Sequence, residues 1–206
     1  MAKTSTKAAL GEKSRLTRDD WIEAASRVLR EESVDAVRIE RLAELLDATR
    51  GSFYWHFKDR ADLLNEVLAA WRLRQTNRII ERLKEDLSLT PMQRVIGLRN
   101  TAKQTKRSEE AAQLELSVRS WARHDRSARK VVIDVDRERI AIAETFLCDA
   151  GMPKDLATTW AFVGYAFTVG SSVLGTELVQ DKIESSRKLL MDAQFPSSNF
   201  ALKEKP

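Results

Sequence analysis

The densest group of side chains able to bind another molecule lies between Thr49 and Arg60. Phe53 and Phe57 stand four residues apart, so on a helix both point to one face, toward a core. Gly51 within a helix costs about 1 kcal/mol relative to Ala, and close approach of the backbone to DNA would explain its presence. A solvated helix seldom exposes Tyr, Trp, His and Arg together, which favours contact with nucleic acid over the alternative, a packed aromatic cluster. The outer faces carry Arg50, Ser52, Tyr54, Trp55 and His56, followed by Lys58 and Arg60.

Three short helices are predicted to position this group. Apolar residues repeat with helical spacing over residues 18–30 and again from Ile39 to Leu46, and Thr17 with Asp20 marks the start of the first helix. The second helix ends at Asp47, a residue type that tolerates the left-handed backbone of a tight turn, and Thr49 offers an N-cap for the third. This is the layout of a helix-turn-helix, in which the last helix enters the major groove of DNA.

Helices are also predicted for the rest of the chain. A long helix begins near Asp59 and runs to about residue 85, a length that suits a connector between a small head and a larger body. Further helices start at Thr90-Pro91, at Ser108 and after Asp125, and an uncharged helix covers about 155–176. No strand pattern is present. We therefore expect an all-α fold, with a three-helix N-terminal head joined by a long helix to a larger helical ligand-binding and dimerisation body.

The composition excludes several other classes of protein. One cysteine, Cys148, and two histidines rule out a disulfide framework, a cysteine-built zinc site and a three-histidine metal site. There is no paired Glu-x-x-His, no glycine-rich phosphate loop and no Cys/His pair, so we expect no enzyme, no metal and no cofactor. Six Ser and Thr residues make residues 156–176 a poor membrane span. The net charge of +4 identifies no DNA-binding region, since residues 19–60 are net acidic.

The run TRGSFYWHFKDRADLL, preceded by IERLAELLDA, resembles the tetracycline-repressor (TetR) family of bacterial regulators over residues 17–68. The resemblance implies phosphate contacts from Tyr54, His56 and Arg60, with Lys58 a weaker phosphate candidate and Thr17 near the DNA backbone. It implies base or phosphate contacts from Arg50, Ser52, Tyr54 and Trp55. The predicted DNA-binding set is Thr17, Arg38, Thr49, Arg50, Gly51, Ser52, Tyr54, Trp55, His56, Lys58 and Arg60.

Two residues depart from the family pattern. Arg38 stands where the family usually has Ser or Thr opening the second helix, so the cap is lost while an arginine–phosphate contact becomes available. Asp47 stands in the turn where the family often has Gly, and Asp adopts the needed geometry with modest strain.

Two sets of residues in the body are predicted to serve assembly and ligand binding. Small residues recur at three- to four-residue spacing on the uncharged helix and suit a dimer interface: Ala157, Ala161, Gly164, Thr168, Ser171 and Gly175. Large aromatic residues suit an apolar effector pocket or, equally, a core: Trp71, Trp121, Phe146, Trp160 and Phe167.

The sequence thus predicts four segments. Residues 1–14 form a basic arm, 15–60 a helix-turn-helix DNA-binding domain, 61–196 an effector-binding and dimerisation domain, and 197–206 a tail. The resemblance implies a homodimeric repressor in the bacterial cytoplasm, at the nucleoid when bound, which a small-molecule effector releases from an inverted-repeat operator. The alternatives are a protein-interaction adaptor that has lost DNA binding and, further off, a helical enzyme.

Overall fold

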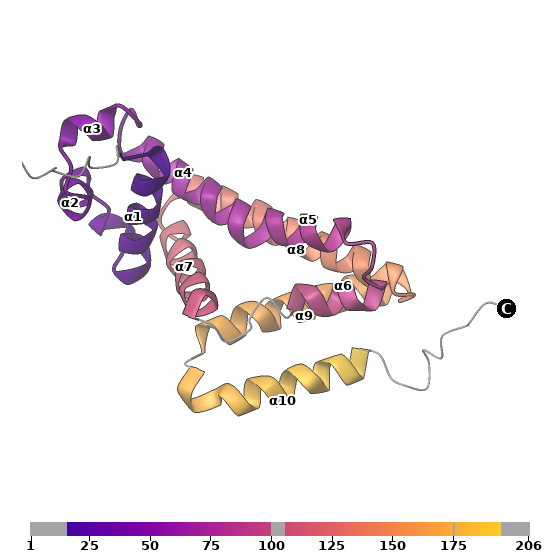
Figure 1. Cartoon of the computed structure of the whole chain (residues 1–206). Coiled ribbons are helices and arrows are strands. Elements are labelled where there is room, and N and C mark those ends of the chain that lie inside the picture. The colour runs from indigo at the N-terminus through magenta and orange to yellow at the C-terminus, as the bar shows by residue number, and fades with distance from the viewer. Residues whose placement is uncertain (1–15, 100–105, 175, 195–206) are drawn as a thin grey trace, which may run out of the picture.

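The computed structural model describes residues 16–99, 106–174 and 176–194, and Gly175 of the predicted dimer set lies outside them. All regular structure in this part of the chain is helical (Figure 1), as the sequence predicts. The helices are α1 (Arg18–Glu31), η1 (Val34–Ala36), α2 (Ile39–Leu45), α3 (Arg50–Tyr54), α4 (Arg60–Arg72), η2 (Leu73–Asn77), α5 (Arg78–Glu85), α6 (Pro91–Arg99), α7 (Lys106–Ala122), α8 (Arg126–Asp149), α9 (Lys154–Val173) and α10 (Thr176–Gln194).

Helix α1 is fixed at its start by a reciprocal cap. The hydroxyl of Thr17 accepts a hydrogen bond from the Asp20 N–H, while the Asp20 carboxylate accepts one from the Thr17 N–H at 2.7 Å. The bond from the Thr17 N–H, and after it a bond that the Thr17 hydroxyl donates to the same carboxylate at 2.7 Å, lower the pKa of Asp20 because they stabilise its ionised form. The helix then buries Trp21, Ala25 and Leu29 against the rest of the head. The predicted start of this helix is confirmed.

The turn between α2 and α3 has the geometry that the sequence predicts. Asp47 adopts φ 48°, the left-handed conformation that lets the chain reverse. Arg38 stands at the N-cap of α2 and makes no capping bond with its side chain. Thr49 caps α3 by accepting from the Ser52 N–H at 3.2 Å. The left-handed backbone of Asp47 and the Thr49 cap thus determine how the chain turns from α2 into α3.

The connecting helix differs from the prediction in one respect. The segment after Asp59 is helical to Glu85, but the five residues of η2 form a π-helical turn between α4 and α5. Such turns are rare and occur where another group competes for the helix carbonyls. Here Arg139 of α8 donates to the Gln75 carbonyl at 3.4 Å and to the Thr76 hydroxyl at 2.9 Å.

Two hydrophobic cores run through the molecule and share helix α8. In Figure 1 α7, α8 and α9 form the sides of a triangle, with the head at one corner and α10 lying along the outside of α9. The first core joins the head to α7 and to the N-terminal half of α8, and the second joins α5 and α6 to the C-terminal half of α8 and to α9. The head is therefore packed directly onto the body. In the described ranges no helix combines the length and apolar character that crossing a membrane requires.

Candidate nucleic-acid interface

One face of α3, the helix that the sequence predicts to enter the major groove of DNA, is buried and contributes to the head core. Phe53 is fully buried and Phe57 is 2% exposed. The sequence predicts both on one helix, but α3 ends at Tyr54, so Phe57 enters the core from the segment that follows the helix. The Phe53 ring meets Trp21 edge-on at 5.4 Å between centroids and stacks on Phe57 at 5.3 Å. This packing fixes the rotation of α3 about its axis, so the opposite face must point outward.

Aromatic side chains dominate that outward face. Trp55 is 80% exposed and Tyr54 is 53% exposed, although both types usually bury most of their surface. Tyr54 rests edge-on against Phe53 at 5.3 Å, which limits its freedom. Ser52 and His56 are half-buried beside them. The face is therefore preformed, with the ring of Trp55 free to contact a partner.

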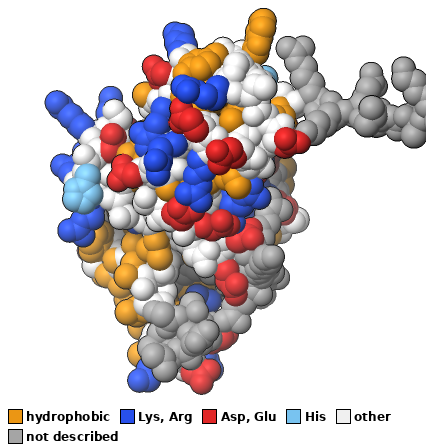
Figure 2. All heavy atoms as spheres, turned by 90° about the vertical axis from the view of Figure 1, so that its left-hand side faces the viewer, with side chains coloured by type: hydrophobic (Ala, Val, Ile, Leu, Met, Phe, Trp, Pro, Cys, Tyr) orange, Lys and Arg blue, Asp and Glu red, His pale blue; other side chains and the backbone are white. Residues whose placement is uncertain are grey.

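Basic side chains surround these rings. Arg38 and Lys58 are exposed, and their side chains make no hydrogen bond or ion pair with the described part of the chain. Arg50 is exposed and is paired with Glu40 at 3.1 Å. Figure 2, which looks at the side of the molecule on which the head lies, shows Lys and Arg side chains with Asp and Glu side chains among them. Two exposed basic side chains of the head, those of Arg38 and Lys58, are thus available to bind an anionic partner.

Gly51 lies on the same face without any internal reason to be glycine. A Cβ added there would meet only the Thr49 Oγ1, at 3.6 Å, which is an ordinary van der Waals contact. The residue is exposed and lies within α3, where Ala would be favoured over Gly. The absence of a side chain at this position leaves the helix backbone open to a partner.

The side chain of Arg60 is engaged within the head, which the sequence does not predict. Its Nε donates to the Val37 carbonyl at 2.6 Å, and one Nη donates to the Val34 carbonyl. Arg60 is half-buried and joins the start of α4 to the turn before α2. This placement differs from that of a side chain directed only at phosphate, so we do not include Arg60 among the contacts proposed below.

Two further residues position the interface and are missed by the sequence analysis. Arg18 donates to the His56 carbonyl, lies 4.5 Å from the centroid of Phe57 and pairs with Glu66 at 3.0 Å. It therefore holds the end of the recognition segment against α1 and α4. Glu40 is the other residue, through its ion pair with Arg50. Neither has a sequence signal, since both act through residues on other helices.

A buried polar network lies in the body, beneath the π-helical turn. Glu115 is 7% exposed and accepts from Arg139 at 3.0 Å, from Arg119 at 2.8 Å and from the indole N–H of Trp71 at 3.2 Å. Asp136 accepts from Arg119 at 2.7 Å. Two carboxylates thus balance two guanidinium groups, and the network connects α4, α7 and α8.

Tyr165 extends this network to α9. Its hydroxyl donates to Asp136 at 2.6 Å and accepts from Arg119 at 2.7 Å. Burial of the phenol raises the pKa of Tyr165 to about 12. Burial alone would lower the pKa of Arg139, but the charge of Glu115 and its hydrogen bonds more than offset this and raise it. Both arginines therefore stay charged.

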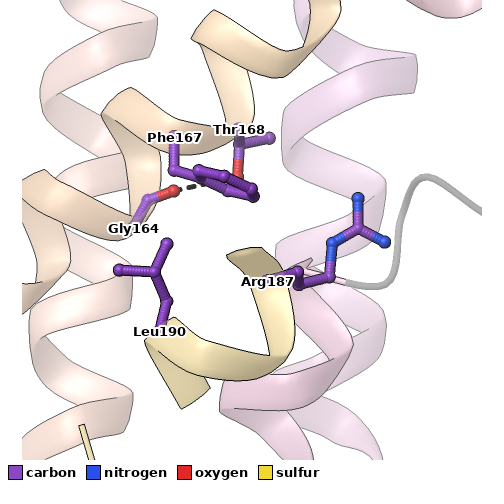
Figure 3. A pocket seen from close by; sticks show the side chains of 5 residues that line it. All are labelled: Gly164, Phe167, Thr168, Arg187 and Leu190. Atoms are coloured by element: carbon purple, nitrogen blue, oxygen red, sulfur yellow. Dashed lines mark hydrogen bonds between the residues drawn. The ribbon is translucent and has the colours of Figure 1, made fainter. Parts of the chain in front are cut away.

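The residues predicted to line one effector pocket are separated by the structure. Trp71 and Trp121 belong to the first core, and Phe146 and Trp160 to the second. Phe167 lines a space of only about 10 Å³ between α9 and α10 (Figure 3), together with Gly164, Thr168, Arg187 and Leu190. Trp71, Trp121, Phe146 and Trp160 thus belong to cores, which is the alternative that the sequence leaves open. An open hollow of about 420 Å³ lies between α7 and α8, lined by Arg119, Ala122, Arg123, Arg129 and Val132.

The small-residue stripe on α9 does not face outward as predicted. Ala157 is fully buried and Ala161 is 2% exposed, both within the second core of the same chain. Gly164 and Thr168 face α10, and Ser171 is half-buried and bonded to the Phe167 carbonyl. The stripe allows close helix packing, but its neighbours are helices of its own chain. The opposite side of α9 and the end of α10 expose large apolar residues instead: Leu156, Phe162, Val173, Leu174 and Leu189.

An all-helical fold with a preformed, aromatic and basic recognition helix defines a helix-turn-helix protein. The sequence model described as "Bacterial regulatory proteins, tetR family" matches residues 22–67. The HTH-type transcriptional regulator AcrR of Shigella flexneri is 34% identical over 61 residues, which are 30% of this chain and 27% of that protein. TtgR of Pseudomonas putida is 39% identical over 57 residues, 28% of this chain and 27% of that protein. Residues 22–67 of this chain are thus similar to the helix-turn-helix segment of tetR-family regulators.

The match to these curated relatives is confined to about a quarter of their length. The likeness of fold extends much further. A TetR-family transcriptional regulator from Rhodococcus sp. superimposes with a TM-score of 0.64 over 84% of this chain and 98% of that one, at 17% identity. The helical body is therefore similar in fold to that of the Rhodococcus protein, at low sequence identity.

Proposed function

We propose that this protein is a sequence-specific DNA-binding transcriptional regulator that uses α3 as its recognition helix. The observation that carries the proposal is the exposure of Tyr54, 53%, at the last position of α3 and of Trp55, 80%, at its C-cap, while Phe53 of the same helix is buried in the first core. A protein does not need two large rings in water to fold. The matched relatives are themselves named as transcriptional regulators, and the family is one of regulators rather than enzymes.

The proposed contacts divide by chemistry. Arg50 and Ser52 at the start of α3 reach base edges, and Trp55 contacts a base or the sugar–phosphate backbone. Gly51 lets the helix backbone approach the DNA closely. Phosphates are bound by the remaining polar and basic groups of the face: Thr17, Arg38, Thr49, Tyr54, His56 and Lys58.

A second copy of the chain would complete the DNA-binding unit. One head contacts few base pairs, whereas two heads on a two-fold axis double the site and produce an inverted-repeat operator. The apolar side of α9 supports this assembly, since Phe162 is 61% and Val173 is 63% exposed. Burial of this surface against its symmetry mate would remove it from water. We therefore assign the dimer interface to this side of α9 rather than to the small-residue stripe.

The buried network supports an effector-controlled repressor. Arg139 holds the π-helical turn of the connector, and Tyr165 ties the same network to α9, the proposed dimer helix. Arg119 belongs to the network and also lines the hollow between α7 and α8. A small molecule that binds Arg119 there would compete with Glu115 and Asp136 for its guanidinium, and so would change the network through which Arg139 contacts the connecting helix. The two heads would then shift apart and leave the operator.

Binding to duplex DNA of random sequence, measured by fluorescence anisotropy over a salt series, tests the proposal. The wild type should bind with an affinity that falls steeply with salt. Lys58→Ala should reduce the slope of log K against log salt by about one. Trp55→Ala should weaken binding without changing the slope, because it removes no charge.

Lys188→Ala is the matched control, since Lys188 is exposed on α10 at the far side of the body. It should change neither affinity nor slope. If the wild type fails to bind at about 50 mM salt, where non-specific binding is strong, the proposed function is wrong. Equal effects of Lys58→Ala and Lys188→Ala would remove Lys58 from the interface.

A further inference from the structure

The proposed DNA-binding surface around α3 contains a carboxylate, that of Glu40, beside the arginine that we propose to read bases. Glu40 of α2 lies 3.1 Å from the Nη2 of Arg50, the first residue of α3. Both side chains are well exposed, at 55% and 61%. In the free protein, the guanidinium of Arg50, which we propose reads bases, is thus paired with the carboxylate of Glu40. This negative charge lies on the surface that we propose binds DNA, which is itself negatively charged.

The fold does not require this pair. Glu40 is in the first turn of α2, where a negative charge is mildly favourable, but Arg38 holds the N-cap and no capping bond to the Glu40 side chain is formed. An exposed ion pair adds little stability. Glu44, one turn further along α2, is also exposed, and it is accommodated in the same helix without forming an ion pair in the described structure. The position of Glu40 therefore has its main consequence for what Arg50 can bind.

Two kinds of DNA partner compete for Arg50. A backbone phosphate is present at every sequence, whereas a guanine edge offers two acceptors, O6 and N7, that match the two parallel donors of a guanidinium. A carboxylate beside Arg50 repels every phosphate that approaches and competes with it for the guanidinium. A guanine edge carries no net charge and meets less of this penalty.

We propose that Glu40 is a specificity-determining residue that restrains Arg50 from non-specific phosphate contacts and leaves it available for a guanine edge. This inference rests on the proposed DNA-binding function and adds a residue to it. Glu40 lowers the affinity for all DNA, but it lowers the affinity for non-cognate DNA more. The ratio of specific to non-specific binding is therefore higher with Glu40 than without it.

The test compares Glu40→Gln with Glu44→Gln, which removes the same charge from the same helix. Each variant is titrated against a random duplex pool and against the best duplex recovered by selection on the wild type, over a salt series. Glu40→Gln should tighten binding to the random pool about three- to tenfold, and binding to the selected duplex at most about twofold, a range typical of single exposed charges. Glu44→Gln should change both affinities by the same small factor.

A second pair of variants separates an effect through Arg50 from a general change of charge. In an Arg50→Met background, Glu40→Gln should lose its effect on the ratio of specific to non-specific affinity, because no guanidinium is left to restrain. An unchanged effect in that background would overturn the inference. So would equal behaviour of Glu40→Gln and Glu44→Gln in a wild-type protein that binds and selects DNA. A wild type that binds neither duplex would overturn the proposed function as well, which distinguishes the two failures.

Discussion

Replacement of Gly51 by Ala should move stability and DNA affinity in opposite directions. An added Cβ meets only the Thr49 Oγ1 at 3.6 Å, so the free protein accommodates it without a clash. Ala in a helix is favoured over Gly by about 0.5–1 kcal/mol. For a chain of this size that gain corresponds to a rise in Tm of about 1–4 °C. If replacing a residue stabilises the fold but weakens binding, that residue contributes to contact with a partner and not to folding.

The same methyl group should weaken DNA binding. If the α3 backbone approaches the DNA closely at Gly51, the Cβ occupies space needed by the partner, and the complex must open by part of an ångström. We expect a loss of at least about tenfold in affinity, equivalent to about 1.4 kcal/mol. Thermal unfolding followed by circular dichroism gives the first quantity, and anisotropy with the selected duplex gives the second.

Ser127→Ala is the matched control, because Ser127 is also the second residue of a capped helix, α8, and is exposed in the body. It should raise Tm slightly and leave DNA affinity unchanged. If Gly51→Ala raises Tm and binds DNA as well as Ser127→Ala does, Gly51 is not at the interface and the reasoning is refuted. A fall in Tm would refute the statement that the position has free space.

Three further predictions concern the body. Glu115→Gln leaves two buried guanidinium groups with one carboxylate, and should lower the free energy of unfolding by about 3–5 kcal/mol, measured in urea, while exposed Glu109→Gln on the same helix should not. Because burial raises the pKa of Tyr165 to about 12, the neutral phenol stabilises the fold fully below about pH 10, and this contribution is lost as pH rises toward 12. Tyr165→Phe should therefore flatten the loss of stability between pH 10 and 12, and an equally steep loss would contradict the assignment. Phe162→Asp should shift the chain from dimer to monomer in sedimentation velocity, since Phe162 is 61% exposed on the proposed interface, and an unchanged dimer would exclude that side of α9.

The parts of the fold that could be predicted from the sequence are those fixed by neighbours in the chain. The cap at Thr17 depends on Asp20, and the cap at Thr49 on Ser52, each three residues away. Asp47 takes its left-handed conformation from its own side-chain type and the length of the turn. The spacing of Phe53 and Phe57 predicts that both rings enter the head core, although α3 ends at Tyr54 and Phe57 lies beyond it.

Interactions between helices that lie far apart along the chain leave no local pattern that would predict them. Glu115 meets Trp71 and Arg139 from segments far away along the chain, and its place among the other charged residues of α7 does not indicate these partners. Small residues on α9 predict close packing but not which helix is packed. The sequence therefore places Ala157 at a dimer interface, whereas the residue is buried in the core of its own chain. The π-helical turn follows from Arg139 on another helix and leaves no pattern in its own residues.

Selection of random duplex DNA on the purified protein at about physiological salt tests the central claim most directly, because non-specific binding is weak there. The account predicts enrichment of an inverted repeat whose two half-sites lie about one helical turn apart, one for each head of a dimer. It also predicts that Trp55→Ala loses this enrichment while Lys188→Ala keeps it. Recovery of no motif by protein that has been unfolded and refolded free of ligand would contradict DNA recognition. The exposed rings of α3 would then have to serve contact with another protein.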